Sequence, residues 1–161
     1  MTSKEIIQKA MAFEMNDIVE RYAEDSQIPI DVAKEHEIEL KRFLALCAIN
    51  PQKSYGMAGI IDEIWHTFIF FTKEYFDFCF KVNGNYIHHV PEKKNGEPNP
   101  APYLEMLKDY ERFFGVKPPA HIWFDITANN ARGNACGSSC SRCGHGCSSC
   151  GHGCRGCTRC G

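Results

Sequence analysis

Residues 57–82 read MAGIIDEIWHTFIFFTKEYFDFCFKV, and this apolar stretch decides the class of fold. Plotted at 100° per residue, Asp62, His66, Lys73 and Asp77 fall within one arc of about 60°. The opposite side is apolar and carries Ile61, Ile64, Trp65, Phe68, Phe71, Tyr75 and Cys79. The pattern predicts a central helix with a broad buried face and a narrow polar stripe.

The segments on either side of this stretch also follow a helical pattern. Ser3 can cap a first helix that runs to about Glu24, and Pro29 suits the first turn of a second helix that stops before Asn50. A fourth helix is expected at about residues 103–114, where it ends at a glycine. Since no alternation of strands and helices is visible, the sequence predicts an all-α fold, a small bundle of about four helices.

Two shorter stretches are expected to connect and cover these helices. Asn83-Gly84-Asn85 predicts a turn after the central helix, and residues 86–90 form a short apolar run that we expect to be extended. Ile122-Trp123-Phe124 is expected to lie over the bundle as a strap. These segments would close the core from the side that the helices leave open.

Four further titratable residues are predicted to lie outside the candidate sites. Cys47 and Cys79 stand among apolar neighbours at helical spacing and are expected to act as small core residues. His36 lies between glutamates and is expected at the surface, and His121, next to an apolar pair, is expected to have a structural role.

The overall composition excludes several classes of protein. The chain has 161 residues, 43% of them apolar, which suits one domain with a real core. No stretch of about 20 apolar residues is free of charge, so we expect no membrane-spanning helix and no membrane partner. The first residues lead into an amphipathic pattern and not an apolar signal core, so we expect a cytoplasmic protein. A net charge of −2 argues against a nucleic-acid partner.

The composition changes abruptly near Ala128. Residues 1–130 hold 14 basic residues and all 20 acids, a net charge of −6, whereas residues 131–161 hold four arginines and no acid. The last segment has eight glycines, eight cysteines and no large apolar side chain, so it cannot bury enough surface to fold alone. We therefore predict a helical domain at residues 1–128 and a disordered Cys/Gly-rich tail at residues 129–161.

The tail repeats the spacings of metal ligands. Its cysteines alternate between Cys-x3-Cys and Cys-x2-Cys, and two units read Cys-Gly-His-Gly-Cys. Two thiolates separated by two or three small residues can fold around one soft ion, and glycines permit the tight turns. The ten predicted ligands are Cys136, Cys140, Cys143, His145, Cys147, Cys150, His152, Cys154, Cys157 and Cys160.

Such donors suit zinc or Cu(I), and their spacing does not choose between the two. We therefore predict that the protein binds, buffers or delivers a thiophilic metal ion without turnover. Disulfides would need an oxidising compartment, an iron–sulfur cluster would lack a familiar spacing, and a nucleic-acid arm would lack lysine and aromatic residues. Another alternative is a precursor whose tail cysteines are changed by a modifying enzyme, and a protein partner for the tail is also open.

A second candidate metal site lies in the helical domain. Asp62 and His66 are one helical turn apart and share a face. The His88-His89 pair follows a turn that can bring one ring back over that helix, and in an extended segment the two rings point to opposite sides. A set of histidines with one acid suits zinc or non-haem iron, and it would make a metal-dependent enzyme centred on Asp62, His66 and His88. A local hydrogen bond between Asp62 and His66 is the structural alternative.

Residues 55–68, with the Asp-x-x-Trp-His-Thr core at Asp62 to Thr67, resemble the glycine-rich domain-containing-protein-like family. The resemblance continues through Tyr75, Cys79, Gly84 and His88-His89, and it covers about residues 55–90. It implies a shared site, without naming a reaction, formed by Asp62, Trp65, His66 and His88. Many members carry a second histidine two residues after the first, and here that position is Phe68, so one potential ligand is absent.

Overall fold

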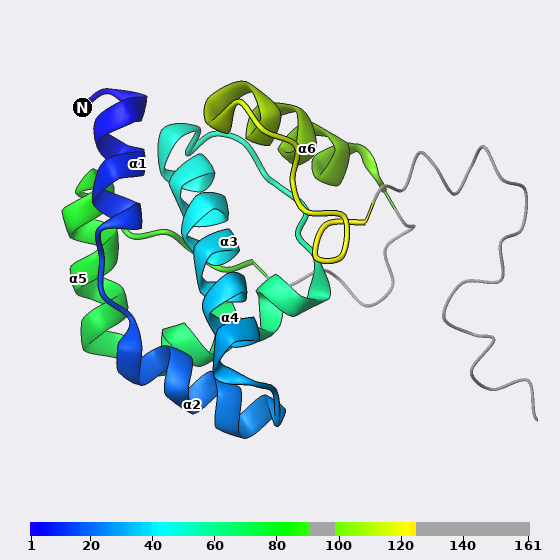
Figure 1. Cartoon of the computed structure of the whole chain (residues 1–161). Coiled ribbons are helices and arrows are strands. Elements are labelled where there is room, and N and C mark those ends of the chain that lie inside the picture. The colour runs from blue at the N-terminus through cyan, green and yellow to red at the C-terminus, as the bar shows by residue number, and fades with distance from the viewer. Residues whose placement is uncertain (91–98, 125–161) are drawn as a thin grey trace, which may run out of the picture. The chain divides into compact units, whose positions relative to one another are not determined.

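The computed structural model of the chain describes residues 1–90 and 99–124, and in these ranges all regular structure is helical. The helices are α1 (Ser3–Met11), α2 (Asn16–Ser26), α3 (Ile30–Ile49), α4 (Gly59–Phe70), α5 (Thr72–Asn83) and α6 (Ala101–Phe114) (Figure 1). The all-α prediction is confirmed, but four helices is too low a number because two of the predicted helices are each divided in two. The chain separates into two units, Met1–Phe124 and Asp125–Gly161, and the predicted disordered tail at residues 129–161 lies outside the described residues.

The first predicted helix is divided into α1 and α2. Thr2, and not Ser3, caps α1: its hydroxyl accepts the Glu5 N–H at 3.3 Å, and the Glu5 carboxylate accepts the Thr2 N–H at 2.7 Å. The chain leaves the helix after Met11 although no glycine or proline stands there. The break turns Phe13 onto the ring of Phe78, with ring centroids 5.2 Å apart. Core packing therefore ends this helix where local propensity would continue it.

The long apolar stretch is also divided, at Phe71, whose ψ of 67° lies outside the helical range. The division lets α4 pack against α2 and α3 while α5 packs against α1 and α3. The buried face predicted for the stretch is nonetheless confirmed on both helices, with Phe71 only partly buried. Its fully buried members are Ile61, Ile64, Trp65, Phe68, Tyr75 and Cys79.

The longest described helix, α3, lies at the centre of the domain (Figure 1). It contacts α1, α2, α4, α5 and α6, and Leu40, Phe43 and Leu44 are among its fully buried side chains. Pro29 stands at its N-terminal boundary and Asn50 at its C-terminal boundary, as the sequence predicts. Neither α3 nor any other described helix is both long and apolar enough to cross a membrane.

The last described segment closes the core. Helix α6 ends at Gly115, whose φ of 70° favours glycine because an L side chain is strained there. The chain then returns to the bundle, where Ile122 and Trp123 are fully buried and Phe124 is exposed. The predicted strap is therefore present, and it is held by two of its three apolar residues.

Candidate metal centre

Helix α4 supplies two polar side chains on its exposed face. Asp62 and His66 are one turn apart, and the Nδ1 atom of His66 lies 3.5 Å from Oδ2 of Asp62. The Asp62 side chain is 37% exposed and that of His66 is 52% exposed, so both reach solvent. Asp62 also stands in the first turn of α4, where the helix dipole favours a negative charge.

His89 joins this pair from the segment that follows α5. Gly84 ends α5 with a φ of 73°, which reverses the chain so that residues 86–90 return toward α4. The Nε2 atom of His89 lies 2.7 Å from Oδ1 of Asp62, and its side chain is only 10% exposed. The ring of His89 lies between two others, with centroids 4.6 Å from His66 and 4.5 Å from Trp65.

The three side chains present one ligand atom each, and these atoms lie within 4.8 Å of one another. Ligand atoms around a tetrahedral zinc ion, at bond lengths of about 2.0–2.1 Å, are roughly 3.3 Å apart. Small side-chain rotations would therefore bring these atoms to bonding positions. Two imidazole nitrogens and one carboxylate oxygen form a donor set that fits zinc or non-haem iron.

His88, the other histidine of the predicted pair, lies apart from this cluster. It is exposed, and its ring contacts Tyr86 at a centroid distance of 5.1 Å. The expectation that only one of the two histidines faces the site agrees with this arrangement, and that histidine is His89. The spacing left His88 and His89 open and the family resemblance suggested His88, but the geometry groups His89 with Asp62 and His66.

The remaining predicted residues fall into two groups. Cys47 and Cys79 are free thiols among apolar side chains, and burial raises the pKa of each, to about 12 for Cys47, so neither is an activated nucleophile. The residues predicted as metal ligands in the tail lie outside the described residues. They are Cys136, Cys140, Cys143, His145, Cys147, Cys150, His152, Cys154, Cys157 and Cys160.

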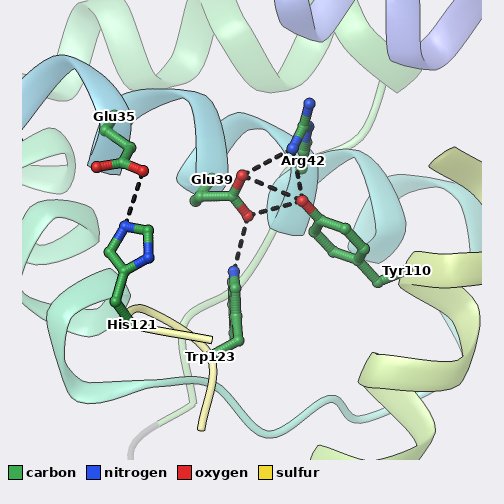
Figure 2. A network of polar contacts seen from close by, with 6 residues as sticks. All are labelled: Glu35, Glu39, Arg42, Tyr110, His121 and Trp123. Carbon is green, nitrogen blue, oxygen red and sulfur yellow. Dashed lines mark hydrogen bonds and ion pairs between the residues drawn. The ribbon is translucent and has the colours of Figure 1, made fainter. Parts of the chain in front are cut away.

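A second polar assembly, centred on Glu39 of α3, escaped the sequence analysis (Figure 2). The carboxylate is buried, with 2% of the residue exposed, and it accepts hydrogen bonds from Trp123 Nε1 at 2.7 Å and from the Tyr110 hydroxyl at 2.9 Å. Arg42 provides the balancing charge at 2.8 Å. Position 39 is one turn before Phe43 and lies with Ala33 and Leu40 on the buried side of α3, and an acid on such a face was the available signal. The network joins α3, α6 and the strap.

Two further histidines lie outside the candidate metal centre. His121 is exposed, and its Nε2 atom lies 2.8 Å from Oε1 of Glu35, beside the Glu39 network (Figure 2). His36 is buried and its Nδ1 lies 3.0 Å from the hydroxyl of Tyr22, so the expectation of a surface position is wrong. Burial lowers the pKa of His36, against the opposing charges of Glu35 and Glu63.

A sequence-family model described as UCP032817-like matches residues 5–101. The matched region contains most of α1 and all of α2 to α5, and with them Asp62, His66 and His89, whereas residues 129–161 lie beyond it. No curated protein and no solved structure shows significant similarity to the chain. The three residues of the candidate metal centre therefore lie inside the matched region, and the Cys/Gly-rich tail lies outside it.

Proposed function

We propose that this chain, which belongs to the UCP032817-like family, binds a divalent transition-metal ion through Asp62, His66 and His89. The observation that supports the proposal is the convergence of three ligand atoms, from two helical positions and one returning loop, within 4.8 Å. His89 distinguishes this site from an ordinary solvated Asp–His pair on a helix surface, because its side chain is nearly buried and its ring contacts Trp65.

Zinc is the ion that the donor set favours, with Fe(II) next. Three protein ligands leave at least one position for water, which is the arrangement of catalytic zinc sites. The exposure of Asp62 and His66 supports access from solvent to that position. A metal-dependent enzyme is therefore the alternative to simple binding, with His89 in the place that the sequence assigned to His88.

The experiment must separate this site from the tail. We define the tail-silent variant as the full chain with serine in place of all eight cysteines from Cys136 to Cys160, together with His145→Gln and His152→Gln. In this background we expect one equivalent of zinc, measured by isothermal titration and by metal analysis after gel filtration. His89→Ala should remove that equivalent because it deletes the least exposed ligand.

The matched control is His88→Ala in the same background. It removes the neighbouring histidine, which is exposed and turned toward Tyr86, and it should leave zinc affinity unchanged within twofold. Equal losses from His88→Ala and His89→Ala would contradict the assignment of ligands. Absence of zinc from the tail-silent variant would contradict the proposal itself.

A second function, supported by the sequence alone, is binding and buffering of zinc or Cu(I) by the tail. The support is the repeated spacing of eight cysteines and two histidines among glycines, with four arginines to offset thiolate charge. This function needs a reducing compartment such as the cytoplasm. The sequence from Asp62 to Thr67 resembles that of glycine-rich domain-containing proteins, and on this ground we propose that the chain is related to them.

The tail proposal is checked by comparing the wild-type chain with the tail-silent variant. Under reducing conditions the wild type should bind two or more additional zinc or Cu(I) ions, seen by native mass spectrometry. Mass increments fixed covalently on the tail cysteines, with no additional metal, would instead identify a precursor for a modifying enzyme.

A further inference from the structure

The loop that carries His89 is hydrogen-bonded to a buried tyrosine. The hydroxyl of Tyr75, in α5, donates a hydrogen bond to the carbonyl oxygen of Ile87 at 2.5 Å. The same hydroxyl accepts a hydrogen bond from Nε1 of Trp65 at 3.1 Å. Tyr75 and Trp65 are both buried, so these bonds form away from bulk water.

This pair of bonds links the metal-ligand positions to one another. Trp65 precedes His66 in α4, and Ile87 stands two residues before His89. The indole of Trp65 also contacts the His89 ring, at a centroid distance of 4.5 Å. Tyr75 therefore sits between the helix that carries two ligands and the loop that carries the third.

The chemistry of the tyrosine suits this role. Burial raises the pKa of Tyr75, so its hydroxyl keeps the proton that it donates to Ile87. The loop is thus held by a hydrogen bond from α5, in addition to the packing of Ile87 against the core.

We propose that Tyr75 is a positioning residue of the Asp62–His66–His89 site, holding the loop so that His89 faces Asp62. The inference rests on the proposed metal binding. Removing the hydroxyl leaves the Trp65 N–H and the Ile87 carbonyl without this partner and frees the loop to rotate. Residues that orient metal ligands in this way typically change metal affinity by about 10- to 100-fold.

The test is Tyr75→Phe in the tail-silent variant. We expect the zinc dissociation constant, from competition with a chromophoric chelator, to rise by about 10- to 100-fold. The visible absorption of bound Co²⁺ should also change in position or intensity, because the coordination of His89 is altered. The matched control is Tyr110→Phe, which removes another buried hydroxyl, from the Glu39 network, and should leave both readouts as in the parent.

A second measurement needs no substitution at Tyr75. The chain has two tryptophans, and their indole N–H groups report separately, Trp65 on the Tyr75 contact and Trp123 on Glu39. On adding zinc to the tail-silent variant, we expect the indole N–H resonance of Trp65 to shift and that of Trp123 to stay in place. This readout can still overturn the positioning role if Tyr75→Phe fails to fold.

The outcomes separate the two proposals. If the tail-silent variant binds no zinc, the metal site itself is wrong. If it binds zinc, but Tyr75→Phe binds equally well with the same cobalt spectrum, the positioning role is wrong while the site stands. If zinc binds and the Trp65 resonance does not move, the positioning role is likewise overturned.

Discussion

Two carboxylates on neighbouring helices, Glu39 and Asp62, have opposite surroundings. Glu39 is buried and its oxygens accept hydrogen bonds from three side chains that keep their protons at ordinary pH, among them a guanidinium. Asp62 is 37% exposed and faces two imidazoles, whose nitrogen atoms can bind a metal. The partners of Glu39 are Arg42, Tyr110 and Trp123, and those of Asp62 are His66 and His89.

The two carboxylates differ chiefly in the chemistry of the side chains that surround them. The Glu39 network connects segments far apart in the chain and leaves no oxygen free for a ligand. The Asp62 cluster leaves one side open to solvent and contributes little to holding the helices together. Stability should therefore depend on the first assembly and metal affinity on the second.

The largest effect is expected from Glu39→Ala. It leaves the Trp123 N–H buried without its acceptor and the partly exposed Arg42 without its partner, and breaking a buried pair costs about 3–5 kcal/mol. We expect this loss in the free energy of unfolding measured by urea titration, with zinc affinity of the folded protein unchanged. Glu39→Gln should lose less because its amide oxygen can still accept a hydrogen bond. A cost below about 1 kcal/mol for Glu39→Ala would show that the network is not structural.

Zinc should stabilise the protein through Asp62. At a free zinc concentration of 100 times the dissociation constant, the free energy of unfolding of the tail-silent variant should rise by about 2.7 kcal/mol. Asp62→Asn should lose most of this increase while its stability without zinc stays within about 1 kcal/mol of the parent. The measurement is urea unfolding with and without zinc, and an undiminished increase in Asp62→Asn would rule out Asp62 as a ligand.

A smaller effect is expected from pH through His36. Burial holds the pKa of His36 below its ordinary value, so the unfolded chain takes up a proton at a higher pH than the folded chain does. Stability should therefore fall as the pH is lowered from about 6.5, the ordinary histidine value. His36→Gln should flatten this dependence, whereas His121→Ala, at an exposed position, should not. Unfolding curves between pH 7 and pH 5, without zinc, measure the slope.

The smallest effect is expected at the surface pair Lys73 and Asp77. Their side chains lie 2.9 Å apart, one turn from each other on α5, and both are largely exposed. Water and salt screen such a pair, so Lys73→Ala should shift neither the unfolding midpoint nor zinc binding measurably. A clear shift in either would show that the polar stripe of α5 has a role that the two carboxylate assemblies do not account for.

Part of this arrangement follows from the sequence. Helical spacing alone places Asp62 next to His66 and buries Trp65 behind them, because one turn of a helix fixes both relations. The same spacing cannot place the break at Phe71, where neither glycine nor proline appears and tertiary packing ends the helix. It also cannot choose His89 over His88, since that depends on the rotation of a loop that Tyr75 holds from another helix.

Other parts lie beyond any local pattern. The pairing of Glu39 with Trp123 joins residues 84 positions apart, and periodicity shows only that each lies on a buried face. At His36 the local pattern gives a wrong prediction, because it places a buried side chain at the surface. Its glutamate neighbours in sequence point elsewhere on the helix, and the position one turn before Leu40 places the ring inward.

Because the chain turns at Gly84, the length of α5 determines the direction in which the segment carrying His89 leaves the helix. One residue added to or removed from this 12-residue helix would rotate the departing chain by about 100° and shift it by about 1.5 Å. His89 would then leave from the wrong side of α5, even with every ligand still present in the sequence. Homologous chains that keep the centre should therefore tolerate insertions before Gly59 or after Val90, and none between Thr72 and Asn83.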